Sequence, residues 1–219
     1  MNWVIEIVVS SIISSIFTAG ILSAIITKLQ KGLELHSNGI KRIYPYGKNI
    51  KSLEKTMKNC TTIKILGFSA LGITHSYRRV LTNHLAKGGK LEFLLAKEDS
   101  EITTEASLME NRGTKAIANS IGETFELLKA IKIDSEKEAE KTGKKCGDIE
   151  VRQYNTEIRN QLIICINSEK EEVSAWMSIL LPPLPAVECK MIEYSEPSDC
   201  VRYYDTIWNR HETHLIKCD

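Results

Sequence analysis

The sequence predicts an α/β protein with a mixed β-sheet flanked by helices. Short runs of β-branched and apolar residues alternate with segments of helical periodicity. Two of the runs, 61–68 and 90–96, are separated by one helical segment, and this order is typical of a parallel βαβ unit. At 219 residues the chain can bury one substantial core without disulfides or metals.

The predicted core begins with the strand at 61–68. The helix that follows, 74–87, is predicted from apolar residues at helical spacing, Tyr77, Val80, Leu81 and Leu85. Gly88-Gly89 is a typical helix stop, and the second strand, 90–96, comes directly after it.

A longer helix is predicted over 114–133 from Ile117, Ile121, Phe125, Leu128 and Ile131. The charged stretch 134–148 has no apolar face to bury, so we expect a solvated loop or an extension of that helix. Further strands are expected at 149–155, 159–167, 173–180 and around 190–192, with a proline-rich break at 181–185. The last helix is expected to begin near Ser198, a good N-cap residue.

The amino-terminal segment predicts a membrane anchor. Residues 7–27 carry no charged side chain over 21 positions, and such a helix is about 30 Å long, which matches the hydrocarbon thickness of a bilayer. Lys28 and Lys31 follow it, so we expect a single-pass protein of the inner or plasma membrane with a cytoplasmic domain. A signal peptide and a buried amphipathic helix are the alternatives.

Three regions are therefore expected: an anchor at 1–27, a basic helical juxtamembrane segment at 28–59, and an α/β domain at 60–219. The middle region holds eight Lys or Arg and two Glu between 28 and 58. Small residues recur every four positions in the predicted anchor, at Ser11, Ser15, Ala19 and Ser23. Such a stripe could pair two helices, so a homodimer is one expectation.

Charge and cysteine spacing exclude some classes of partner. The formal net charge is +1, which gives no reason to expect nucleic acid as a partner. The six cysteines contain no C-x-x-C pair, so neither a metal nor a cofactor is expected, and we interpret the cysteines as reduced thiols. His211 and His214 share a helical face, but they are more typical of surface histidines.

Four segments in order carry a resemblance to a known family. They are GIKRIYPYG (39–47), IKILGFSALGI (63–73), LAKGGKLEFLLAKEDS (85–100), and IEVRQYN (149–155) before an apolar strand. This order resembles the phospholipase D-like domains of bacterial proteins, over roughly 39–215. The resemblance implies a phospholipase D-like mixed sheet flanked by helices.

The catalytic motif of that family, H-x-K-x-x-x-x-D on a strand, is degenerate in this sequence. On RNQLIICIN (159–167) the His place is Asn160, the Lys place is Leu162 and the Asp place is Asn167. Asn cannot serve as the nucleophile and Leu cannot hold a phosphate. We therefore expect no catalytic residue here and no phosphodiester cleavage by the family's route.

Ligand-binding residues are still expected. Ser69 precedes a predicted helix whose amides could hold an anion, and His75, Arg152 and Arg159 are the other candidates. The leading hypothesis is a membrane-anchored interaction module for a phosphate-bearing ligand.

Two alternatives remain open. One is a phosphodiesterase or nuclease that uses His75 or His84 with Ser69. The other is a structural membrane scaffold with Trp176, Trp208 and Tyr203 as interface anchors.

Overall fold

The computed structural model describes residues 39–45, 50–109, 113–156, 158, 160–179, 189–210 and 213–215. The chain divides into two units, Met1–Lys41 and Arg42–Asp219. Within the described ranges, the cluster of buried hydrophobic residues belongs to the second unit.

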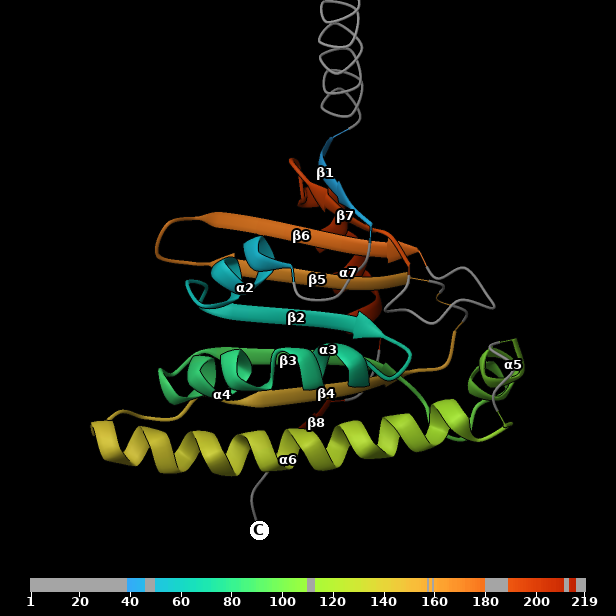
Figure 1. Ribbon diagram of the computed structural model, residues 1–219, viewed down its shortest axis with the longest axis horizontal. Helices are drawn as coiled ribbons and strands as arrows, with labels where there is room; N and C mark the ends of the chain where they lie inside the picture. Colours follow the sequence, from blue (N-terminus) through green and yellow to red (C-terminus); the bar gives the residue numbers. More distant parts are fainter. Residues whose placement is uncertain are drawn as a thin grey trace, which may run out of the picture. The chain divides into compact units, whose positions relative to one another are not determined.

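The described strands form one mixed sheet with the order β1-β7-β6-β5-β2-β3-β4-β8 (Figure 1). They are β1 (Ile40–Tyr44), β2 (Thr62–Gly67), β3 (Lys90–Ala96), β4 (Ile149–Tyr154), β5 (Asn160–Asn167), β6 (Glu172–Ile179), β7 (Met191–Tyr194) and β8 (Thr213–Leu215). β2, β3 and β4 are parallel to one another, and β5 runs antiparallel to β2. The predicted parallel pairing of the first βαβ unit is thus confirmed.

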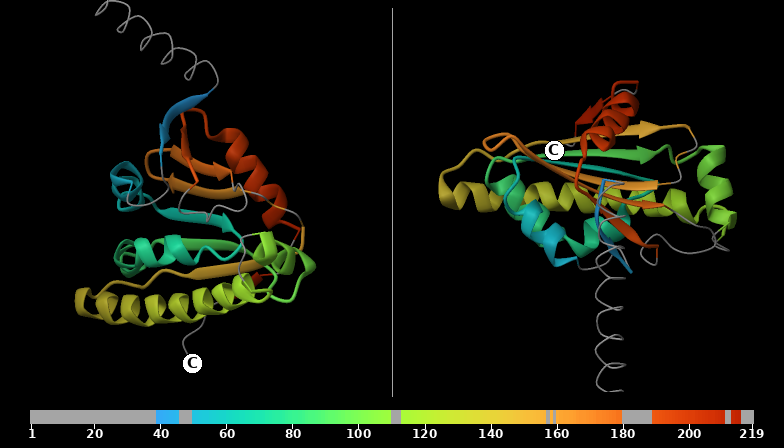
Figure 2. Two further views of the ribbon diagram at one scale, coloured as in Figure 1. Left: turned by 45° about the vertical axis from the view of Figure 1, so that its right-hand side comes forward. Right: turned by 90° about the horizontal axis from the view of Figure 1, so that it is seen from above.

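Helices cover both faces of this sheet (Figure 2). They are α2 (Lys51–Met57), α3 (Leu71–Ser76), α4 (Arg78–Ala86), α5 (Glu101–Met109), α6 (Ala116–Thr142) and α7 (Ser198–Trp208). α2, α3, α4 and α6 lie on one face, and α7 crosses the other. Successive residues of a strand point to opposite faces, so each strand contributes to both layers.

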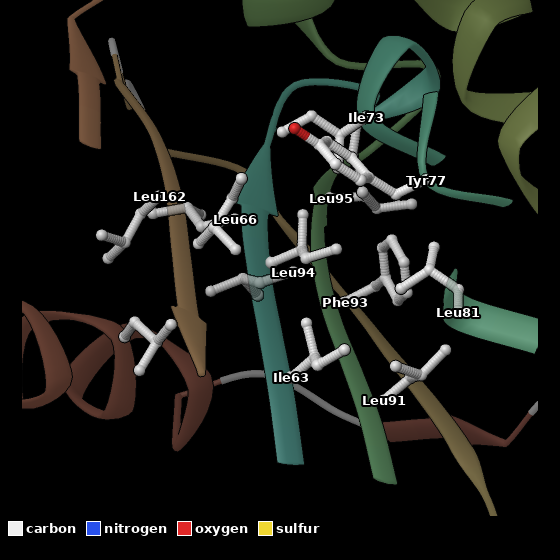
Figure 3. Close-up of a cluster of buried hydrophobic side chains, with 14 of the residues drawn as sticks. Ile63, Leu66, Ile73, Tyr77, Leu81, Leu91, Phe93, Leu94, Leu95 and Leu162 are labelled. Carbon is white, nitrogen blue, oxygen red and sulfur yellow. The ribbon is translucent and has the colours of Figure 1, made fainter. Parts of the chain in front are cut away.

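The first layer is apolar. Figure 3 shows Ile73, Tyr77 and Leu81 of the helical segment grouped with Leu91, Phe93 and Leu95 of β3. These side chains are at most 5% exposed. The Ser135 hydroxyl of α6 donates to the Thr82 carbonyl of α4 at 3.1 Å. Helix α6 therefore also contacts this layer, through a serine side chain.

The second layer joins charged and aromatic groups. The Lys64 ammonium of β2 lies 2.7 Å from Asp205 Oδ1 of α7 and 5.1 Å from the centroid of the Tyr204 ring. Tyr204 is fully buried and donates to the Glu92 carbonyl of β3 at 3.3 Å. α7 is therefore held on the sheet by polar contacts as well as apolar ones.

The predicted fold class requires one correction. The mixed α/β sheet is present, but no helix among the described residues is long and apolar enough to cross a membrane. The predicted anchor at 1–27 lies outside the described residues. The transmembrane helix, and with it the single-pass localisation at the inner or plasma membrane with a cytoplasmic domain, is withdrawn.

Several element boundaries also differ from the prediction. The helix expected at 74–87 is divided into α3 and α4 at Tyr77, whose hydroxyl accepts the Ile50 N–H at 3.0 Å. The segment 28–59, expected to be helical, contains strand β1 as well as α2. Helix α7 has Pro197 as its N-cap residue, so Ser198 is the first helical residue.

Candidate functional site

The carboxyl edge of the parallel strands holds the candidate site. β3 ends there at Ala96 and β4 at Tyr154. Because β5 runs antiparallel to β2, its first residue, Asn160, lies at the same edge. Ligands of open α/β sheets usually bind beyond this edge.

Tyr154 carries a buried hydroxyl that has no hydrogen-bond partner among the described residues. The side chain is 0% exposed, and burial, together with neighbouring Tyr203, raises its pKa. The hydroxyl therefore keeps its proton at neutral pH and is a donor. The register partner of Tyr154 on β3 is Ala96, whose small side chain occupies little of the space beside the ring.

Asn160 supplies a second unpartnered atom at this edge. Its Oδ1 is buried without a partner, while its Nδ2 donates to the Tyr203 hydroxyl at 3.4 Å. Tyr203 comes from α7 and is 37% exposed, so it connects the buried groups to solvent. We call Tyr154, Asn160 and Tyr203 the edge cluster.

The edge cluster has the chemistry of a binding site. Leaving a buried donor or acceptor unpaired costs roughly 1–3 kcal/mol, and a bound polar group recovers this free energy. Tyr154 offers a proton, and Asn160 Oδ1 can only accept one. A phenol with a raised pKa is a poor general acid, and an amide is neither a nucleophile nor a base, so these groups suit recognition and not catalysis.

The three degenerate motif positions do not form one site. Leu162 is 0% exposed in the core. Asn167 is at the far end of β5, about 23 Å along the strand from Asn160. There its Nδ2 donates to the Asn59 carbonyl at 2.8 Å, and its Oδ1 accepts the Glu169 N–H at 3.1 Å. Of these positions only Asn160 belongs to the candidate site.

Arg152 and Ser69, both predicted to bind ligand, lie on opposite faces of the sheet. The Arg152 guanidinium lies 4.3 Å from the centroid of the Trp208 ring, and its Nη1 donates to the Trp208 carbonyl. The Ser69 carbonyl instead accepts the hydroxyl of Thr124, on α6, at 2.8 Å. The structure therefore does not bring Ser69 and Arg152 together.

The remaining candidate residues are also dispersed. His75 is exposed on α3, and Arg159 lies outside the described residues. His84 is buried beside Lys90, at the amino end of β3, with its Nε2 3.1 Å from the Lys90 carbonyl. Ser69 follows the carboxyl end of β2, so the alternative catalytic pair of His84 and Ser69 is not assembled.

The structure gives little support to the residues predicted as interface anchors or metal ligands. Trp176 and Trp208 are core residues, 0% and 7% exposed, which leaves Tyr203 as the accessible aromatic of the three. No group of three His, Cys, Asp or Glu with a metal-binding arrangement occurs within the described ranges. His211 is outside those ranges, and only the backbone of His214 is described, in β8.

Comparison with known proteins identifies no family. No family model and no curated protein matches the chain. Among solved structures, the chain is similar to TrmBL2, an archaeal chromatin protein whose structure shows a novel mode of DNA binding, with 13% sequence identity and a TM-score of 0.43. The match covers 87% of this chain and 63% of that protein. Similarity at this level carries no argument about the function of this chain.

Two expectations about partners are corrected here. Membrane anchoring has no helix among the described residues to support it. The exclusion of nucleic acid is also withdrawn, because it depended only on the net charge of the whole chain. The small net charge of +1 was a weak ground for that exclusion, since it says nothing about local charge.

The sequence predicted Asn160 only as the remnant of a motif, and it missed Tyr154. Tyr154 is the next-to-last residue of the predicted strand at 149–155, where an aromatic residue is ordinary. The lack of a partner for its hydroxyl depends on β4, β5 and α7 meeting at one edge, and no local pattern shows this.

Proposed function

We propose that the protein is a non-catalytic binding module with a phospholipase D-like fold, and that its ligand binds at the edge cluster. One observation carries the proposal: the hydroxyl of Tyr154 and Oδ1 of Asn160 are both buried and unpartnered at the carboxyl edge of the sheet. The order of sequence segments that resembles the family supports the fold assignment. The degenerate motif supports the absence of catalysis.

The two unpartnered atoms define the ligand chemistry. Tyr154 is a donor and suits an oxygen acceptor, such as a phosphate oxygen. Asn160 Oδ1 is an acceptor and needs an O–H or N–H on the ligand. We therefore propose a phosphate-bearing ligand that also carries hydroxyl or amine donors, the combination found in nucleotides and sugar phosphates. The partly exposed ring of Tyr203 suits stacking against a ring of such a ligand.

Isothermal titration of the full chain with nucleoside monophosphates, sugar phosphates and inorganic phosphate tests this proposal. We expect binding by a compound that carries both phosphate and donor groups, and weaker binding of inorganic phosphate. No heat with any member of the panel would remove the proposal.

The variant Tyr154→Phe tests whether the ligand binds at the edge cluster. It removes a hydroxyl that has no protein partner, so the free energy of unfolding should stay the same or rise, while affinity for the ligand falls about 3- to 10-fold. Tyr194→Phe is the matched control, because the Tyr194 hydroxyl contacts Met177 Sδ at 3.7 Å, away from the edge cluster. Equal affinity in wild type and Tyr154→Phe would contradict the assigned site.

A further inference from the structure

Two exposed apolar side chains flank Asn160 of the edge cluster. Ile179, the last residue of β6, is the register partner of Asn160. Side chains of such partners lie on one face of the sheet, with Cβ atoms about 5 Å apart. Tyr203 approaches Asn160 from α7, since its hydroxyl accepts the Asn160 Nδ2 at 3.4 Å, and α7 contacts both β5 and β6. We call Ile179 and Tyr203 the apolar pair.

The exposure of the apolar pair distinguishes it from the rest of the surface. Ile179 is 53% exposed and Tyr203 is 37% exposed. Single exposed hydrophobic side chains are normal. Here, however, two of them meet at a residue whose buried Oδ1 has no partner among the described residues. Apolar surface around a few unpartnered polar groups is typical of a small-molecule site.

The groups at this edge are ordered by depth on one face of the sheet. Tyr154 is fully buried, and the Oδ1 of Asn160 is a buried atom on a partly exposed residue. The register through β3, β2 and β5 places Tyr154 and Asn160 on the same face, which is the face that α7 covers. The apolar pair is the most exposed part of the arrangement.

This order matches the order of groups in a nucleotide. A phosphate oxygen would accept the Tyr154 proton at the deepest point, and a ribose hydroxyl would donate to Asn160 Oδ1. The base, which follows the ribose, would then lie at the surface beside Ile179 and Tyr203. A sugar phosphate supplies the first two groups, but it has no flat apolar part for the third.

We propose that the ligand is a mononucleotide whose base stacks on the apolar pair. This inference rests on the proposed function, because the edge cluster holds the phosphate and the ribose. The Tyr203 hydroxyl is already hydrogen-bonded to Asn160, so Tyr203 offers the base its ring and Ile179 offers its methyl groups. Stacking on a ring tolerates every base, because each base has a π-face. The apolar pair therefore selects nucleotides as a class, with little discrimination among bases.

Isothermal titration of the full chain with adenosine monophosphate and with ribose 5-phosphate tests this inference. The two compounds carry the same phosphate on the same sugar, and only the first has a base. We expect adenosine monophosphate to bind about tenfold more tightly, as base stacking on an aromatic side chain would give. Ile179→Ser should remove most of this preference and leave the affinity for ribose 5-phosphate nearly unchanged.

Val173→Ser is the matched control. Val173 is also a partly exposed apolar residue of β6, and it lies on the same face as Ile179. It is six residues away, about 20 Å along the strand, so Val173→Ser should keep the wild-type preference for adenosine monophosphate.

The outcomes separate this inference from the proposed function. If both compounds bind wild type with equal affinity, the edge cluster still binds ligand, but the apolar pair holds no base and the inference fails. It also fails if Ile179→Ser weakens both compounds to the same extent, because Ile179 would then act on the site and not on the base. If neither compound binds, the proposed function and this inference both fail.

Discussion

Leu162 occupies the position at which the phospholipase D-like motif would carry its lysine. The side chain is 0% exposed and lies beside Leu66 of β2, its register partner (Figure 3). A side chain in this place contributes to the core by packing, and an ammonium there would be buried. Leu162 is thus a core residue of the sheet.

We predict that Leu162→Ala lowers the free energy of unfolding by about 2–5 kcal/mol, because it removes buried methyl groups and leaves a cavity. Leu162→Lys should be more destabilising, since it also buries a charge. The control Leu162→Met conserves volume and should cost less than about 1.5 kcal/mol. Urea unfolding measures all three. If the lysine variant is as stable as the methionine variant, position 162 is hydrated and accessible to solvent, which would contradict its assignment to the core.

Individual polar residues show the limit of prediction from sequence. The strand that contains Asn160 was predicted, and its apolar centre is buried as expected. Asn160 and Asn167 have the same chemistry and frame the same strand. One has an unpartnered buried oxygen, and the other completes a turn with Asn59 and Glu169. The difference arises from non-local neighbours, so the sequence cannot distinguish the two.

At the scale of elements, α7 is attached to the sheet through a partly buried ion network, in which Lys64 and Glu92 are the buried members. Lys64 Nζ lies 2.7 Å from Asp205 Oδ1 and 3.2 Å from Glu92 Oε2, the latter without hydrogen-bond geometry. Glu92 Oε1 is also 3.0 Å from the Lys90 ammonium. Removing one member of such a network leaves a charge that is buried and incompletely paired.

We predict that Lys64→Met destabilises the protein by roughly 3 kcal/mol, because Glu92 loses one of its two cations. Adding Glu92→Gln should recover a large part of this loss, with a coupling free energy of about 0.5–3 kcal/mol in a double-mutant cycle. The exposed pair of Lys58 and Glu54 is the control, and Lys58→Met should change stability by less than about 1 kcal/mol. Additive effects of the two core substitutions would show that the network is not coupled.

Element types were easier to predict than element ends. Strand β3 was predicted at its observed bounds, because a run of apolar residues is bounded by Gly88-Gly89. Helix α6 extends to Thr142 through the charged stretch that we expected to be a loop or an extension. Its buried face there consists of small residues, Ser135 and Ala139, which contact the core closely but give no hydrophobic pattern. Packing against α4 therefore decided the length of α6.

At the scale of the whole molecule, buried acidic groups determine how stability depends on alkaline pH. Seven tyrosines occur in the chain. Burial raises the pKa of five of them, Tyr44, Tyr77, Tyr154, Tyr194 and Tyr204. Burial also raises the pKa of three cysteines, Cys146, Cys165 and Cys200. The folded protein thus holds these protons at a pH where the unfolded chain releases them.

We predict that the free energy of unfolding falls as pH rises above about 8.5 and falls more steeply above about 10. These are the values at which cysteine and tyrosine ionise in an unfolded chain. Above them the folded state binds more protons than the unfolded state, so the slope of stability against pH is negative. Cys60 acts in the opposite direction between its folded pKa of about 6 and its unfolded value, where it stabilises the folded state as pH rises.

Urea unfolding between pH 7 and pH 11, with a reductant present, measures this dependence. Tyr154→Phe removes one of the five tyrosines without removing a protein hydrogen bond. Above pH 10 its stability should therefore fall less steeply than that of wild type, by up to about 1.4 kcal/mol for each pH unit. If Tyr154→Phe and wild type lose stability in parallel, the Tyr154 hydroxyl is hydrated in solution and ionises as in an unfolded chain.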